Sequence, residues 1–194
     1  MSTHAYTEDQ LVEQPAIQLF ADLGWETVSA MEEAFGFAEP SPPPSPKGRG
    51  SVFLGREAKG EVVLVPRLRS ALERLNPQLP PEAITAAVDE LSRDRSAMTP
   101  AAANRSVWEL LRDGVKVSVP DRERGGQKTD RVRVVDWENP QNNDFLLVSQ
   151  MTVTGQLYTC RPDLVGFVNG VLFWVAIDSG AAFRVEAGQT GKLV

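Results

Sequence analysis

The chain has 194 residues, of which 42% are hydrophobic and 24% charged, and its formal net charge is -6 at pH 7. These values favour one globular domain over residues 1–194, and the sequence shows no long apolar run and no signal peptide. We therefore expect a cytoplasmic protein. The negative charge argues against independent DNA binding, since neutralised phosphates supply most of the affinity in such complexes.

The first fifty residues predict a helix and then an irregular insertion. Segment 7–28 has apolar residues at helical spacing, Pro15 predicts a kink or a helix start nearby, and Gly24 predicts the helix end. Five prolines then fall within residues 40–46, and such a run forms neither a helix nor a central strand. We expect a flexible Pro-rich insertion at about 39–51 inside the single domain.

The middle of the chain predicts three helices, and the part after it predicts strands. A short apolar stretch and a helix cover 61–76, and further helices cover 80–94 and 99–114, the last with Thr99 as N-cap and Gly114 as terminator. Short β-rich runs follow at 115–119, 131–137, 144–153, 155–160, 162–168 and 171–177. This order predicts an α/β (α+β) domain with helices against one sheet. The single cysteine, Cys160, falls in one of these strands and is expected to be a small buried core residue.

Residues 162–178 predict a β-hairpin with an acid at each open end. Asn169-Gly170 is a strong turn signal between two apolar runs, Asp163 opens the first run and Asp178 closes the second. Antiparallel pairing brings the two carboxylates together, where they repel unless a cation lies between them. Because Mg²⁺ prefers hard oxygen ligands and activates water at phosphodiesters, the pattern indicates a candidate magnesium site.

Four segments carry a family resemblance: 7–28, 55–77, 103–119 and 132–170. The most specific part is "RPDLVGFVNG" at residues 161–170. Together they resemble the N-terminal nuclease domain of the R subunit of type I restriction enzymes, a PD-(D/E)xK fold. The resemblance implies a restriction-endonuclease-like mixed β-sheet flanked by helices. It also implies Mg²⁺-dependent DNA cleavage within an ATP-driven complex that contains methyltransferase and specificity subunits.

The resemblance also assigns candidate site residues. It implies that Asp163 is the metal-binding aspartate of the motif and that Glu13, in the first helix, faces the metal centre. The family places a Glu-x-Lys about fourteen residues after the aspartate, which falls on Ile177 and Ser179 in this chain. A one-residue bulge lets Asp178 serve as the acid, but no register supplies the lysine. We therefore expect Asp163 and Asp178 as catalytic acids, Asp163, Asp178 and Glu13 as metal ligands, and no cleavage by the chain alone.

The tail at about 175–194 diverges from the family, whose chain continues into an ATP-driven motor. Either the chain is a naturally short, diverged protein, or its gene is truncated or frame-shifted, and we favour the second explanation. The "GQTGK" at residues 188–192 lacks the first glycine of a phosphate-binding loop. We expect ATP to be used by the family's motor and not by this chain.

A basic segment at 120–134 is a second candidate site, with Arg122, Arg124, Lys128 and Arg131 as candidate DNA-binding residues. A solvated hairpin loop is the interpretation we favour, and phosphate contact near a cleavage site is the alternative. Three functions remain open for the whole chain. The leading one is the nuclease domain of an R subunit. The others are a non-catalytic module that docks on the methyltransferase and specificity core, and a gene remnant that does not fold stably.

Overall fold

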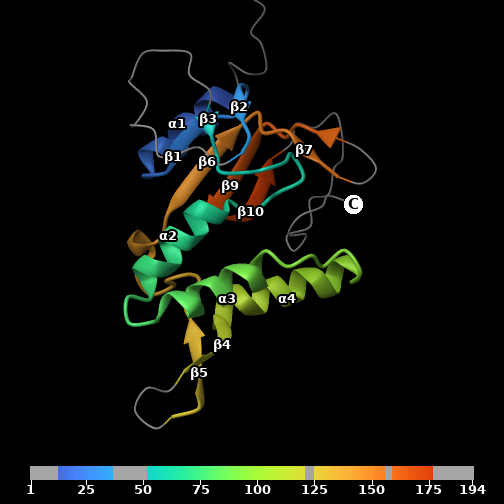
Figure 1. Ribbon diagram of the computed structural model, residues 1–194. Coiled ribbons are helices and arrows are strands. Elements are labelled where there is room, and N and C mark those ends of the chain that lie inside the picture. Colours follow the sequence, from blue (N-terminus) through green and yellow to red (C-terminus); the bar gives the residue numbers. More distant parts are fainter. Residues whose placement is uncertain (1–12, 37–51, 121–124, 156–158, 177–194) are drawn as a thin grey trace, which may run out of the picture.

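The computed structural model describes residues 13–36, 52–120, 125–155 and 159–176 (Figure 1). Its centre is a four-stranded mixed sheet in the order β1 (Glu26–Ser29), β6 (Phe145–Ser149), β9 (Leu164–Val168) and β10 (Val171–Ala176). Strands β1 and β6 are parallel, whereas β9 is antiparallel to both β6 and β10. With its helices, this sheet confirms the predicted α/β class.

Among the described residues, three two-stranded pairs accompany the central sheet. They are the parallel pair β2 (Glu33–Ala34) with β3 (Val52–Phe53), and the antiparallel pairs β4 (Val115–Pro120) with β5 (Gln127–Val132) and β7 (Val153–Thr154) with β8 (Thr159–Cys160). Cys160 is buried, as expected from the sequence. No helix within the described ranges has both the length and the apolar character needed to cross a membrane.

The helices follow the start and stop signals in the sequence. They are α1 (Gln14–Asp22), α2 (Val65–Leu75), α3 (Pro81–Leu91) and α4 (Pro100–Asp113), with a short 3₁₀ turn at Pro140–Asn142. The hydroxyl of Thr99 accepts a hydrogen bond of 3.4 Å from the backbone N–H of Ala102, and Gly114 ends α4 with a φ of 78°. Pro15 lies in the first turn of α1. Because these start and stop signals depend on neighbouring residues only, the sequence was sufficient to locate these helix ends.

Both faces of the central sheet are covered. On one face, side chains of β6 and β9 pack under the segment that leads from β3 to α2, in a cluster that includes Leu54, Val62, Leu64, Leu146, Val148, Val165 and Phe167. On the other face, Phe20 of α1 stacks on Trp174 of β10 with ring centroids 5.1 Å apart. Trp174 in turn lies against Gly166, where a Cβ atom would come within 2.1 Å of the indole nitrogen. Strand β9 is therefore buried along its whole length.

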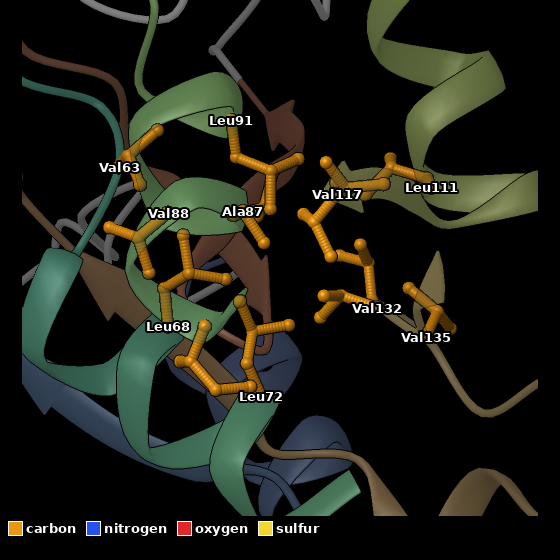
Figure 2. Close-up of a cluster of buried hydrophobic side chains, with 14 of the residues drawn as sticks. Val63, Leu68, Leu72, Ala87, Val88, Leu91, Leu111, Val117, Val132 and Val135 are labelled. Carbon is orange, nitrogen blue, oxygen red and sulfur yellow. The ribbon is translucent and has the colours of Figure 1, made fainter. Parts of the chain in front are cut away.

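A second core lies between α2, α3, α4 and the β4–β5 ribbon. Figure 2 shows Leu68 and Leu72 of α2, Ala87 and Leu91 of α3, and Val117 of β4 converging on it. The burial of β4 alternates residue by residue, as expected for a strand with one face in the core. Figure 1 shows the β4–β5 ribbon extending beyond α3 and α4, away from the four-stranded sheet.

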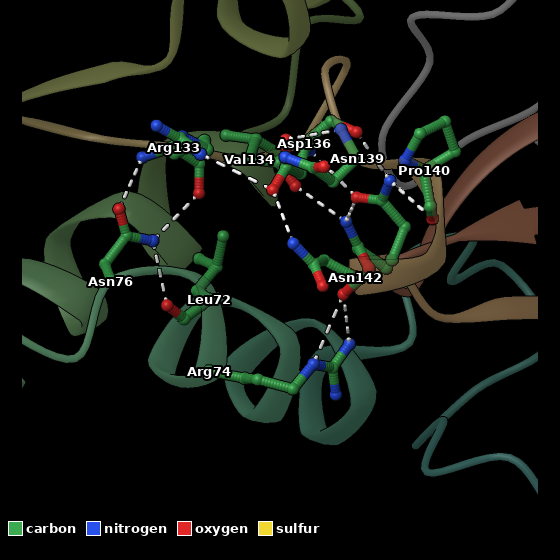
Figure 3. A network of polar contacts seen from close by, with 11 residues as sticks. Leu72, Arg74, Asn76, Arg133, Val134, Asp136, Asn139, Pro140 and Asn142 are labelled. Carbon is green, nitrogen blue, oxygen red and sulfur yellow. Dashed lines mark hydrogen bonds and ion pairs between the residues drawn. The ribbon is translucent and has the colours of Figure 1, made fainter.

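Several segments differ from the sequence prediction, among them the run 144–153, which the structure divides into β6 and β7. Strand β1 was not predicted, because four residues directly after a helix carry little periodicity. The run 131–137 was predicted as a strand, but β5 ends at Val132. Beyond that point the side chain of Asn76 replaces a partner strand: it accepts from the N–H of Arg133 at 2.8 Å and donates to its carbonyl oxygen at 2.9 Å (Figure 3).

Two other predictions fall outside what the structure describes. The Pro-rich insertion at about 39–51 lies in the undescribed residues. Of the tail at about 175–194, the structure describes only the last two residues of β10, whose backbone pairs with β9.

Candidate functional site

The hairpin predicted around Asn169-Gly170 is present as β9 and β10. Asn169 and Gly170 have φ values of 51° and 77°, and two successive positive φ angles are typical of a type I′ turn. The register between the strands shifts between Leu172 and Trp174, so one extra residue, Phe173, stands on β10. A one-residue bulge of the kind considered from the sequence therefore exists in this hairpin.

Asp163 lies directly before β9, at the end of the sheet where β1, β6 and β10 finish. We call this the Asp163 end of the sheet. The carbonyl oxygen of Asp163 accepts a hydrogen bond of 3.0 Å from the backbone N–H of Gln150, the residue after β6. The last described pair of the hairpin is Ala176 with Leu164, next to Asp163. Asp178 lies outside the described residues, so its pairing with Asp163 remains a prediction.

Glu13, which precedes α1, lies at the same end of the sheet. Both oxygens of its carboxylate accept hydrogen bonds from the side-chain nitrogen Nε2 of Gln150, at 3.1 and 2.9 Å. Gln150 thus contacts Glu13 through its side chain and Asp163 through its main chain. The sequence analysis did not identify Gln150, and its only signal there is an amide inside an apolar run.

A cleft of about 550 Å³ opens beside this contact, between α1 and the ends of β1 and β6. Its polar lining consists of one acid, two amides and three hydroxyls: Glu13, Gln14, Thr27, Ser29, Ser149 and Gln150. Ile17, Val28, Met31 and Leu147 complete the wall. Such a mixture of hydrogen-bonding groups over an apolar floor is typical of a ligand cleft.

The metal prediction can be tested on the donor set. Within the described ranges, no group of three or more His, Cys, Asp or Glu side chains is arranged to hold an ion. The described candidate ligands are thus the carboxylates of Glu13 and Asp163, and Gln150 contacts the first directly and the second residue through its main-chain carbonyl. Mg²⁺ at phosphoryl-transfer sites is usually held by one or two carboxylates together with water and substrate phosphates. In the chemistry of their oxygen donors, these two residues are of the type that binds Mg²⁺.

The predicted basic residues that the structure describes lie on the β4–β5 ribbon and not at the Asp163 end of the sheet. Lys128 and Arg131 are exposed on β5, while Arg122 and Arg124 lie outside the described residues. The ammonium of Lys128 forms an ion pair of 3.2 Å with Asp130. The backbone N–H of Arg131 and then this ammonium hold the pKa of Asp130 below its ordinary value. Strands β4 and β5 pair as an antiparallel ribbon, and the ribbon points away from the central sheet (Figure 1).

The chain is an α/β protein with a mixed sheet and an aspartate directly before the buried strand β9. Comparison with known proteins gives its family. The chain belongs to the family described as type I restriction enzyme R protein N terminus, whose family model matches residues 5–176. The resemblance stated from the sequence is thereby confirmed.

Two relatives of known description support the assignment. The "Type I restriction enzyme HindI endonuclease subunit" of Haemophilus influenzae is 34% identical over 164 residues, which cover 82% of this chain. The "Putative type I restriction enzyme MjaIXP endonuclease subunit" of Methanocaldococcus jannaschii is 28% identical over 172 residues, which cover 84% of this chain. In both cases the match covers only 14% of the relative's length.

Proposed function

We propose that this chain is the endonuclease module of a type I restriction R subunit. In this proposal Mg²⁺ binds at the Asp163 end of the sheet to Asp163, Asp178 and Glu13. An ion held by these carboxylates would supply Lewis-acid chemistry, which lowers the pKa of water and so suits hydrolysis of a DNA phosphodiester. The observation that carries the proposal is that Gln150 joins Glu13, from the start of the chain, to Asp163, at the head of β9, in a family member.

The chain on its own binds the metal without cutting DNA. A lysine beside the two acids stabilises the charge that develops on the phosphate and takes part in proton transfer. Neither Ser179 nor Gly180, the positions at which the two registers place it, is a lysine. The proposed setting is a cytoplasmic complex in which an ATP-driven motor and the methyltransferase and specificity subunits act on the same DNA.

Plasmid nicking tests this proposal. The purified chain with Mg²⁺ or Mn²⁺ is expected to leave supercoiled plasmid intact. Gly180→Lys, which creates an acid-x-lysine sequence after Asp178, is expected to introduce slow nicking that Asp163→Ala abolishes. Robust nicking by the unaltered chain, lost in Asp163→Ala, would refute its inactivity. Nicking that persists in Asp163→Ala would refute the assigned site.

DNA contact is assigned to the basic ribbon, with Arg122, Arg124, Lys128 and Arg131 facing phosphates. The net charge of -6 makes this contact weak, so other subunits supply most of the grip. A plot of log affinity against log salt has a negative slope. Changing all four residues to Gln should make this slope shallower by about 0.9 for each phosphate that the variant no longer neutralises. Arg105→Gln is the control, because Arg105 is exposed on α4 and pairs with Glu109. An unchanged slope in the fourfold variant excludes the ribbon from DNA binding.

The missing lysine also favours a second candidate, a non-catalytic module that docks on the methyltransferase and specificity core. A pull-down with that core distinguishes the two functions, since a docking module binds it without DNA, metal or Asp163. The chain is further proposed to fold as one domain that includes the insertion at about 39–51. A single cooperative thermal transition is expected, whereas a gene remnant would unfold without one.

A further inference from the structure

We propose that Gln150 is a positioning residue, which holds the carboxylate of Glu13 in place for divalent-cation binding at the Asp163 end of the sheet. This inference rests on the proposed metal site, but it adds a residue that neither the motif nor the family resemblance assigned. Gln150 reaches the site from the carboxyl end of β6, between the two elements that carry the acids.

The contact geometry leaves the acid able to bind an ion. One nitrogen, Nε2 of Gln150, donates to Oε1 of Glu13 at 3.1 Å and to Oε2 at 2.9 Å. Each carboxylate oxygen can accept more than one interaction, so these hydrogen bonds fix the orientation of the group and leave coordination sites open. The main chain of Gln150 donates to Asp163 at 3.0 Å. One residue therefore sets the position of Glu13 relative to the head of β9.

The backbone of Gln150 gives independent support. Its φ of 57° lies in the left-handed region, which a long side chain rarely adopts. Such a conformation persists where surrounding contacts impose it, and these positions cluster at functional sites. Glycine would form this turn with less strain but has no amide to reach Glu13. A long amide at a position better suited to glycine points to a use for the side chain.

The expected consequence follows from how metal ligands are supported. Carboxylates that bind metals are themselves held by hydrogen bonds, and loss of such a partner typically weakens metal affinity by about 10–100-fold. Gln150 also lines the same cleft as Glu13, so both side chains border one solvent-accessible space. Removing this amide should weaken metal binding even if the fold is unchanged.

Titration of the full chain with Mn²⁺, followed by electron paramagnetic resonance, tests the proposal. Mn²⁺ suits the same oxygen ligands as Mg²⁺. Gln150→Gly is expected to weaken Mn²⁺ binding by about 10-fold or more, while its unfolding temperature without metal stays equal or rises because the strain is relieved. Gln18→Ala is the matched control, since Gln18 is an amide of α1 that donates to Asp22 and should leave Mn²⁺ affinity unchanged.

A purely structural residue would give the opposite pattern, with lower stability in Gln150→Gly and unchanged Mn²⁺ affinity, and that result would overturn the proposal. If Gln150 acts through Glu13, adding Gln150→Gly to Glu13→Gln should weaken Mn²⁺ binding no further. A further additive loss would contradict this route.

The proposed metal site is tested separately by Asp163→Ala, which should abolish binding. If Asp163→Ala abolishes binding and Glu13→Gln weakens it but Gln150→Gly does not, only the role of Gln150 fails. If the unaltered chain does not bind Mn²⁺, both proposals fail.

Discussion

The side-chain amide of Asn169 donates a hydrogen bond of 2.8 Å to the carbonyl oxygen of Val134, and so joins the turn of the β9–β10 hairpin to the loop after β5. The same nitrogen donates to Oδ1 of Asn143 at 2.9 Å, and Oδ1 of Asn169 accepts from the N–H of Asp144 at 2.7 Å. Asn169 is completely buried. The residue that signals a turn in the sequence also anchors the hairpin that begins at Asp163.

Asn169→Gly should lower the free energy of unfolding by about 2–4 kcal/mol, because buried partners of the amide each cost about 1–3 kcal/mol when left unpaired. Glycine accepts the positive φ, so the loss reports the hydrogen bonds and not backbone strain. Urea unfolding measures the change. Gln141→Ala, which removes an exposed amide from the same loop, is the control and should change stability by less than about 0.5 kcal/mol. Equal effects of the two variants would contradict the anchoring role.

Arg56 and Glu33 form a buried ion pair at the two short strands β2 and β3. The guanidinium of Arg56 is fully buried, and Glu33 is 4% exposed. Arg56 donates to Oε1 of Glu33 at 2.8 Å and to the carbonyl oxygens of Glu61 and Thr152 at 3.0 and 3.1 Å. Because Thr152 lies two residues after Gln150, this ion pair joins the β2–β3 pair to the chain beside the candidate site.

Arg56→Met should lower the free energy of unfolding by about 3–5 kcal/mol, since it leaves the carboxylate of Glu33 buried without its partner. Adding Glu33→Leu should recover part of this loss, because the unpaired charge is then removed as well. Arg105→Met is the control, as the side chain of Arg105 is 81% exposed. If the double variant is no more stable than Arg56→Met, the cost does not come from an isolated charge on Glu33.

The features predictable from the sequence are those set by neighbouring residues. The cap at Thr99, the stop at Gly114 and the turn at Asn169 each depend on the chemistry of a few adjacent positions. The burial of Arg56 and the contact between Gln150 and Glu13 depend instead on residues far apart in the sequence. The latter pair is 137 positions apart in sequence, and no local pattern encodes which strand end meets which helix. For the same reason the sequence indicated Asp163 but not the residue that joins it to Glu13.

Asp136 should make the free energy of unfolding depend on pH under acidic conditions. Its carboxylate is almost wholly buried and accepts from the side-chain amide of Asn142 at 2.8 Å and the N–H of Asn139 at 3.1 Å (Figure 3). The hydrogen bond from Asn142, followed by that from Asn139, holds its pKa below the ordinary value. The unfolded chain therefore takes up this proton at a higher pH, about 3.9 for a free aspartate. The stabilisation is complete above the unfolded pKa and is lost as the pH falls through the folded pKa.

Urea unfolding between pH 7 and pH 3, roughly the range around the free aspartate pKa, measures this effect. The free energy of unfolding of the unaltered chain should fall below about pH 4, and Asp136→Asn should fall less steeply. Asn142→Ala should give an intermediate slope, since it removes the largest cause of the shift. Some dependence should remain in every variant, because the pKa of Asp130 is also lowered. Parallel curves for Asp136→Asn and the unaltered chain would exclude Asp136 as the source.

Gly170 fits the hairpin turn against the first turn of α2. Its carbonyl oxygen accepts from the N–H of Leu64 at 2.8 Å, and a Cβ atom at this position would lie 2.6 Å from the nitrogen of Leu68. Gly24 has a similar positive φ, 88°, but nothing lies within 4 Å of its Cβ position. Both Gly→Ala changes therefore carry the strain of about 1–2 kcal/mol expected for a left-handed alanine, and only Gly170→Ala adds a clash with backbone. Gly170→Ala should lower the free energy of unfolding clearly more than Gly24→Ala does, because the hairpin and α2 must then separate. Equal losses in urea unfolding would show that the turn of the β9–β10 hairpin does not depend on close packing against α2.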